Sequence, residues 1–202
     1  MILLCSDGLT GEALVTELQK RVTGPGKAAL VVTADGKYKE KNYHVPRCRA
    51  ELEKLGFTVD LFDIDTEDAG RLSGYDLVEF IGGNPFYLLH AVRRAGARPV
   101  LEKLASERVL IGWSAAAIVF GPSLELVNGY TPEMNTVGLT DLNGLGLTET
   151  EVLPHYGRFL LRFDRFEEKC TLYEQRKGKT VIRLNDGDGV FVDADRTLTV
   201  RA

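Results

Sequence analysis

The sequence predicts an α/β fold with a mostly parallel sheet covered by helices on both faces. Strand and helix patterns alternate along the chain, which is typical of parallel sheets with helical crossovers. With 202 residues, 44% of them hydrophobic, the chain is long enough for one sizeable core and short for two. Two of the strands run into small-residue corners that open helices. We therefore expect one domain over residues 1–202.

Apolar runs bounded by polar or glycine-rich segments define the strands, and apolar residues at helical spacing define the helices. The elements expected in chain order are a strand at 1–5, a helix at 12–21, a strand at 28–33, a helix at 46–55, strands at 58–62 and before Gly82, a helix at 86–94, a strand at 109–111, a helix from 115 and a strand at 124–127. Two late strands, 180–184 and 189–192, flank an Asp-Gly turn and predict a β-hairpin.

The segment Gly112-Trp113-Ser114-Ala115-Ala116 has the pattern of a nucleophilic serine. Ser114 falls between a buried strand and a helix of small residues, at a sharp turn that projects the hydroxyl outward. Small neighbours are needed there because strand and helix pass close together. The elbow pattern G-x-S-x-G departs at Ala116, and a buried structural serine is the alternative interpretation.

A second corner follows the strand that ends at Gly82-Gly83. Asn84 is a good N-cap and Pro85 suits the first helical position. Glycines let the backbone approach a ligand, and a helix N-terminus offers oriented N–H groups to an oxyanion. The alternative is a tight turn without a ligand.

His155 ends the short apolar run Val152-Leu153-Pro154. Proline stops a sheet ladder, so the imidazole is expected at a strand end, where catalytic side chains collect. His90 falls within a helical pattern and His44 in a polar loop, and neither has a comparable positional argument.

Together, IGGNPFYLL, IGWSAAA and VLPHY resemble the peptidase E family, the S51-type serine peptidases that include aspartyl dipeptidase. The resemblance covers most of the chain. It implies a three-layer α/β/α fold related to class I glutamine amidotransferases and exopeptidase activity on small peptides. It also implies that Ser114 is the nucleophile, that His155 is the general base, and that backbone amides around Gly83 and Ala115 form the oxyanion hole.

The triad acid is where this sequence departs from the family. In aspartyl dipeptidase an aspartate follows the serine by fifteen residues. The corresponding position here is Gly129, which cannot orient an imidazole. We expect Glu133, in the turn-rich loop just beyond, to replace it. Glu125, on the strand expected at 124–127, and Asp141, among turn-forming residues, are the competitors.

Basic residues after His155 are spaced by four, three and four, which would align them on one helix face: Arg158, Arg162, Arg165 and Lys169. A solvated face is one interpretation. The other is that Arg158 or Arg162, with Asn84, binds the substrate, since the resemblance implies that an arginine downstream of the histidine recognises an N-terminal aspartate. No single position aligns, so we expect peptides beginning with other residues to be cleaved at least as well.

A net charge of −4 without a dense Lys/Arg run argues against nucleic-acid binding. The first residues resemble a core strand and not a signal peptide, so we expect a cytoplasmic protein that binds no membrane. Cys5, Cys48 and Cys170 are odd in number and widely spaced, which predicts reduced thiols and no zinc site. We expect no cofactor. The sequence leaves the oligomeric state open, with a homodimer as the candidate assembly.

The favoured interpretation is a serine exopeptidase of dipeptidase type that acts on short peptides through an acyl-enzyme on Ser114. One alternative is a cyanophycinase-like hydrolase of the same fold, acting on β-linked aspartyl peptides. The other is an inactive binding or regulatory relative, which Ala116 and Gly129 would permit.

Overall fold

A seven-stranded sheet forms the centre of the computed structural model, which describes residues 1–22, 24–193 and 196–202. The strand order is β3-β2-β4-β5-β1-β8-β9. The first five of these strands are mutually parallel, whereas β8 and β9 run antiparallel to their neighbours. These strands are β1 (Ile2–Cys5), β2 (Gly26–Val31), β3 (Phe57–Phe62), β4 (Leu77–Phe80), β5 (Val109–Trp113), β8 (Gly189–Asp193) and β9 (Arg196–Val200).

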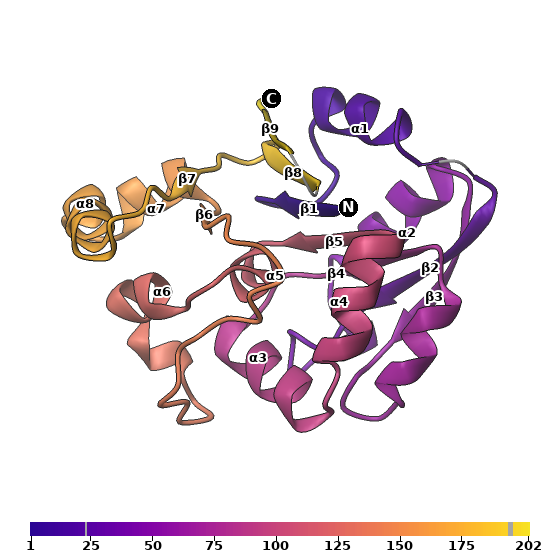
Figure 1. Cartoon of the computed structure of the whole chain (residues 1–202), viewed down its shortest axis with the longest axis horizontal. Coiled ribbons are helices and arrows are strands. Elements are labelled where there is room, and N and C mark those ends of the chain that lie inside the picture. The colour runs from indigo at the N-terminus through magenta and orange to yellow at the C-terminus, as the bar shows by residue number, and fades with distance from the viewer. Residues whose placement is uncertain (23, 194–195) are drawn as a thin grey trace.

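Helices cover both faces of the sheet (Figure 1). They are α1 (Glu12–Gln19), α2 (Val45–Lys54), α3 (Pro85–Arg94), α4 (Arg98–Glu107), α5 (Ala115–Phe120), α6 (Glu125–Tyr130), α7 (Tyr156–Arg162) and α8 (Phe166–Lys177), with 3₁₀ helices η1 (Lys39–Lys41), η2 (Ala69–Gly74) and η3 (Pro132–Met134). One core cluster packs α1 and α2 on the sheet, and the other packs α3, α4, α5, α6 and α8 on the opposite face. The three-layer α/β/α prediction is therefore confirmed.

The alternation of side chains along each strand supplies both clusters. On β1, Ile2 and Leu4 face one layer, while Leu3 and Cys5 face the other, as the two-residue period of a strand requires. A sheet buried on both faces needs continuous apolar strands, and these β1 residues are all almost completely buried.

The carboxyl ends of the parallel strands meet at one edge of the sheet. Since β4, β5 and β1 are neighbours, the residues that follow them, Gly82, Ser114 and Ser6, gather there. The antiparallel β8 begins at this edge, because Cys5 at the end of β1 pairs with Gly189 at the start of β8. The loop before β8 therefore arrives beside Ser114, as expected for sites at the carboxyl ends of open α/β sheets.

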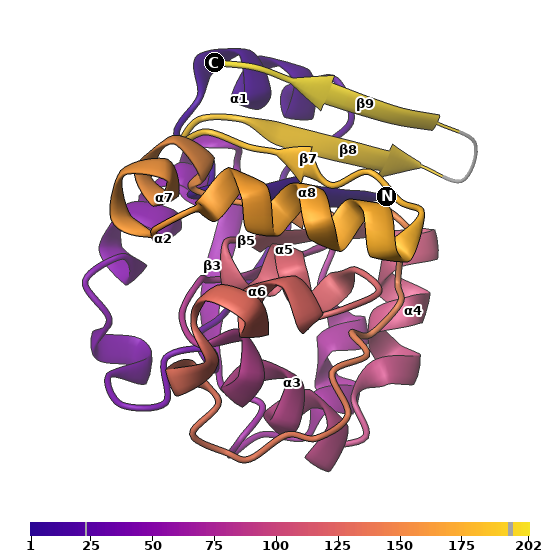
Figure 2. The same ribbon diagram turned by 90° about the vertical axis from the view of Figure 1, so that its left-hand side faces the viewer.

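The late hairpin prediction is wrong. The strand before the Asp-Gly turn is β7 (Ile182–Arg183), which pairs in parallel with β6 (Val152–Leu153) in a separate two-stranded sheet. The strand after the turn, β8, pairs with β1 and β9. Figure 2 shows β8 and β9 at the margin of the sheet beside α1. The central strand β1 offers β8 a ladder with buried faces, which outweighs the local turn signal.

Two further expectations are corrected. The segment expected as a strand at 124–127 is the start of α6, where Leu126, Val127 and Tyr130 pack into the core at helical spacing. The basic stripe after His155 does not lie on one helix, because α7 ends at Arg162 and α8 begins at Phe166, after Arg165 with a φ of 51°.

Within the described ranges, no helix combines the length and apolar character needed to cross a membrane.

Candidate active site

Ser114 occupies a strained corner between β5 and α5. Its backbone has φ 51° and ψ −114°, a conformation that L-residues rarely adopt and that functional sites retain. Its N–H donates to the carbonyl of Cys5 at 3.1 Å, and its carbonyl accepts from Ile118 N at 3.2 Å. These two bonds fix the turn that presents the hydroxyl.

Close packing explains the small residues around this turn. A Cβ at Gly112 would lie 2.6 Å from the ring of Phe120 and 3.1 Å from the backbone of Ala116. A Cβ at Gly82 would lie 2.9 Å from Cβ of Ser114. The Gly82-Gly83 corner thus lies directly against Ser114. Ala116, which stands where the elbow motif has its second glycine, is close to Gly112.

His155 meets Ser114 from the end of β6. Its Nε2 lies 2.9 Å from Oγ of Ser114. The histidine has left-handed backbone angles, φ 58° and ψ 27°, and its N–H donates to the buried Ser6 Oγ at 2.8 Å. The short strand, its stop at Pro154 and this bond to Ser6 together orient the imidazole toward Ser114.

Asp186 is the carboxylate that contacts the other side of the imidazole. Its Oδ1 lies 2.7 Å from Nδ1 of His155 and accepts a bond from Ser6 Oγ at 3.0 Å. Its second oxygen pairs with Nε of Arg158 at 2.9 Å. The loop is held in place by the N–H of Gly187, which donates to Asp7 at 2.9 Å.

Burial favours the neutral form of the His155 imidazole. Burial lowers the pKa of His155 below its usual range, the Asp186 carboxylate acts to raise it, and the Arg158 guanidinium acts to lower it. Partial burial alone would raise the pKa of Asp186, but its bonds from His155 and Ser6 and the charge of Arg158 keep that pKa below its usual range. The site therefore joins the Asp186 carboxylate, the His155 imidazole, whose neutral form is favoured, and the Ser114 hydroxyl by two consecutive contacts.

Each of the two corners carries a backbone N–H without a backbone acceptor among the described residues. The amide of Ala115 is the first of α5 and has no intrahelical partner. Among the backbone hydrogen bonds of the described residues, none uses the amide of Gly83. A Cβ at Gly83 would lie 2.4 Å from the carbonyl oxygen of Ala34, so this close passage admits only glycine. Such donors suit a developing oxyanion.

The structure does not bring Glu133 to His155. Glu133 is exposed on η3, and this segment is tied to α3 by the Met134 carbonyl, which accepts from Asn84 at 2.7 Å. Asp186, from much later in the chain, takes the place on Nδ1 that Glu133 was expected to fill.

The competing carboxylates are engaged elsewhere. Glu125 pairs with Arg176 and Lys177 of α8. Asp141 pairs with Arg93 and accepts from Asn143 N, in the turn role expected of it. Gly129 lies on an exposed part of α6, and a Cβ there would have no heavy atom within 4 Å, so this position contributes nothing to the imidazole.

The residues expected to bind substrate have other partners or point to solvent. Asn84 is the N-cap of α3, accepting from Phe86 N and Tyr87 N. Arg158 contacts Asp186. Arg162 is exposed on α7, with its guanidinium 5.2 Å from the ring of Phe163.

Sequence reasoning missed two residues of this site. Asp186 was placed only in the Asp-Gly turn of the expected hairpin, and Ser6 was given no role. His44 was expected in a polar loop. In the structure His44 lies edge-on to Trp113, 5.0 Å between ring centres, and its pKa is lowered by burial and by nearby cations that include Arg47. An aspartate just before a strand that returns to the carboxyl edge was the signal available for Asp186.

Comparison with known proteins identifies the family. The model of peptidase family S51 matches residues 2–200. An "Uncharacterized peptidase" of Listeria innocua is 30% identical over 191 residues, covering 92% of this chain and 89% of that protein. A "Peptidase E" of Streptomyces coelicolor is 28% identical over 160 residues, covering 77% of this chain and 64% of that protein.

Solved structures share the fold. A crystal structure described as a "Putative Peptidase E Protein" from Listeria monocytogenes EGD-e superposes with a TM-score of 0.77 at 25% identity, covering 100% of this chain and 98% of that one. A peptidase from an acI-B1 actinobacterium gives a TM-score of 0.69 at 20% identity, covering 98% and 84%. With its family model matched almost end to end, this chain is a member of peptidase family S51.

Proposed function

We propose that this protein is a serine exopeptidase of dipeptidase type that hydrolyses short peptides, with Ser114, His155 and Asp186 as its catalytic triad. The observation that carries the proposal is the continuous contact from Ser114 Oγ to His155 Nε2, 2.9 Å, and from His155 Nδ1 to Asp186, 2.7 Å. Membership of family S51 and the relatives named peptidase E support peptide bonds as the substrate.

In the proposed first step, Ser114 Oγ attacks the scissile carbonyl carbon while His155 Nε2 takes its proton. The carbonyl oxygen becomes an oxyanion, which the N–H groups of Gly83 and Ala115 stabilise. The imidazolium then donates its proton to the leaving amine, and the C–N bond breaks to give an acyl-enzyme and a free amine.

In the second step, water attacks the acyl carbon while His155 Nε2 takes a proton from the water. His155 then donates this proton to Ser114 Oγ as the ester bond breaks, which releases the carboxylic acid product and restores the Ser114 hydroxyl. Asp186 accepts from Nδ1–H throughout, which fixes the tautomer and stabilises the transient imidazolium. Arg158, paired with the outer oxygen of Asp186, keeps that carboxylate ionised and in place.

The test is covalent labelling combined with a peptide panel. We expect one fluorophosphonate molecule to add to the protein, on Ser114. The variant Ser114→Ala should form no adduct, and its kcat should fall by about 10⁶-fold. Ser106→Ala, an exposed serine on α4, is the matched control and should retain both. No adduct on the folded wild-type protein would eliminate the acyl-enzyme mechanism.

The peptide panel separates the proposed specificity from that of a related hydrolase. It contains α-linked dipeptides, the same peptides extended at either end, and β-linked aspartyl peptides. Exclusive cleavage of the β-linked members would assign a cyanophycinase-like reaction. Labelling of Ser114 without turnover of any member would indicate a binding relative.

A further inference from the structure

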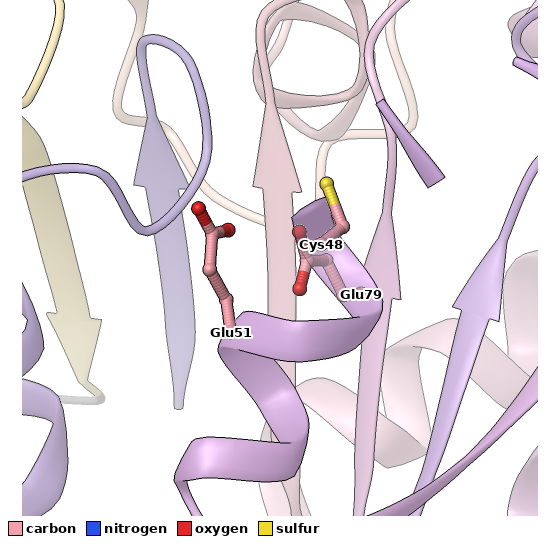
Figure 3. Close-up of side chains that lie close together, drawn as sticks. All are labelled: Cys48, Glu51 and Glu79. Carbon is pink, nitrogen blue, oxygen red and sulfur yellow. The ribbon is translucent and has the colours of Figure 1, made fainter. Parts of the chain in front are cut away.

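A second cluster of reactive side chains lies inside the molecule, between α2 and β4 (Figure 3). Cys48 and Glu51 are three residues apart on α2 and so project from the same side of the helix. Glu79 is on β4, in the central sheet, and shares a strand face with Leu77, which packs in the core under α2. Figure 3 shows the three side chains close together, with Cys48 and Glu51 on α2 and Glu79 beside Cys48.

The donor atoms of this cluster are close together, and three of its carboxylate oxygens lack a hydrogen-bond partner. The thiol sulfur and one oxygen from each carboxylate lie within 4.8 Å of one another. In the described part of the chain, neither oxygen of Glu79 has a hydrogen-bond partner, and Oε2 of Glu51 has none. Glu79 is 0% exposed. A buried carboxylate without a partner is costly, and such groups are paired or bind a cation.

Burial favours the protonated, uncharged forms of these groups. It raises the pKa of Glu79 to about 8 and also raises those of Cys48 and Glu51. A metal ion would therefore displace protons from its ligands when it binds. Arg47 pairs with Oε1 of Glu51 at 2.9 Å and leaves Oε2 to the cluster. Three ionised donors against one guanidinium would leave two negative charges, which a divalent cation would balance.

We propose that Cys48, Glu51 and Glu79 bind a divalent transition-metal ion of the zinc class. A thiolate selects such ions over Mg²⁺ and Ca²⁺, which prefer oxygen ligands alone. Donors around tetrahedral zinc are roughly 3.5 Å apart, given Zn–S and Zn–O bonds of about 2.3 and 2.1 Å. The side chains therefore need to close by about one ångström, and water would complete the coordination.

The proposed site differs from the zinc sites that cysteine spacing can predict. Zinc sites are recognised in sequence by pairs of cysteines or histidines at short intervals. Here only one cysteine takes part, and the folded chain supplies the other donors from the next helical turn and from a distant strand. The ion would join α2 to the strand whose end carries the Gly82-Gly83 corner.

A cobalt titration of the metal-free wild-type protein tests the proposal. Protein treated with a chelator and a reductant should bind one equivalent of Co²⁺ and develop the near-ultraviolet band of a thiolate-cobalt bond, and Zn²⁺ should displace it. At a Zn²⁺ concentration about 100-fold above Kd, Tm should rise by roughly 5–10 °C. A folded wild-type protein without stoichiometric binding, or with binding but no thiolate band, would overturn the site.

Variants assign the ligands. Glu79→Gln, which is nearly isosteric, and Cys48→Ser should each weaken binding by about 100-fold or more. Cys170→Ser is the matched control, because Cys170 is equally buried but lies on α8, against the other face of the sheet; it should retain the band. Persistence of the band in Cys48→Ser would overturn the assignment. Binding is measured equally well in Ser114→Ala protein, so the result is independent of peptidase activity.

Discussion

The Asp186 carboxylate lies 2.7 Å from Nδ1 of His155, although the two residues are 31 positions apart and belong to different loops. Ser6, at the end of β1, joins them by accepting from the backbone of His155 and donating to Asp186. The acid of the proposed triad therefore follows the histidine in the chain, and no carboxylate between Ser114 and His155 is needed for it.

Replacing the acid should separate Asp186 from the candidate nominated by sequence. We expect Asp186→Asn to reduce kcat by about 10²- to 10⁴-fold, because an amide no longer fixes the productive tautomer of His155. Glu133→Gln and Asp141→Asn, both exposed, should keep wild-type turnover. Steady-state kinetics on one dipeptide compares the three, with circular dichroism to verify folding. Full activity in Asp186→Asn would refute this assignment.

The pH dependence of the reaction should reflect the lowered pKa of His155. The imidazole must be neutral to accept the Ser114 proton, so activity is present above this pKa and is lost as pH falls through it. We expect the acidic limb of kcat/KM to lie below about pH 6.5, the ordinary value for histidine. Asp186 acts to raise this pKa, so Asp186→Asn should move the limb to still lower pH. A wild-type limb above pH 7 would contradict the predicted environment.

Ser6 should affect catalysis by positioning other groups. Ser6→Ala removes a donor to an ionised carboxylate and an acceptor for the His155 amide, interactions worth roughly 1.5–3 kcal/mol when the partner is charged. We expect a fall in kcat of about 10- to 100-fold with KM nearly unchanged. Ser73→Ala, whose exposed hydroxyl contacts only its own 3₁₀ turn, is the control. An increase in KM alone would instead place Ser6 in substrate binding.

Substrate preference should not depend strongly on an N-terminal aspartate. Arg158 is already paired with Asp186, and Arg162 is exposed on α7, so neither presents an unpaired buried guanidinium to a substrate carboxylate. Without such a group, neutral substrates incur no large penalty. Matched Asp-, Asn- and Leu-initiated dipeptides should agree in kcat/KM within about tenfold. A large Asp advantage that disappears in Arg162→Ala would reverse this conclusion.

The strand-to-helix corner should tolerate little additional volume. Gly112→Val would place atoms against the Phe120 ring, which lies 2.6 Å from even a Cβ at this position, and overpacking of this kind costs about 1–3 kcal/mol. Gly74→Ala, where a Cβ meets no heavy atom within 4 Å, is the matched control. Denaturant unfolding should show a lower free energy of unfolding for the first variant only.

The sequence by itself determined the layered fold and half of the site. Continuous apolar strands, helical spacing and small-residue corners act over a few neighbouring residues, so their pattern predicted the parallel sheet and the position of Ser114 at its turn. The stop at Pro154 likewise placed His155 at a strand end, where the structure has it. These features depend on local backbone geometry, which neighbouring side chains largely decide.

Only the tertiary structure decided which distant groups meet. Local turn chemistry at Asp186-Gly187 favoured a hairpin, but pairing of β8 with β1 carried Asp186 to His155 instead. The same holds for Glu79, whose sequence neighbours show an ordinary buried strand, and whose approach to Cys48 and Glu51 follows from the packing of α2 on the sheet. Strand order depends on the free energy gained when whole faces of the sheet are buried under the helices, and this energy is summed over the entire core. The pattern of a short sequence segment therefore cannot predict it.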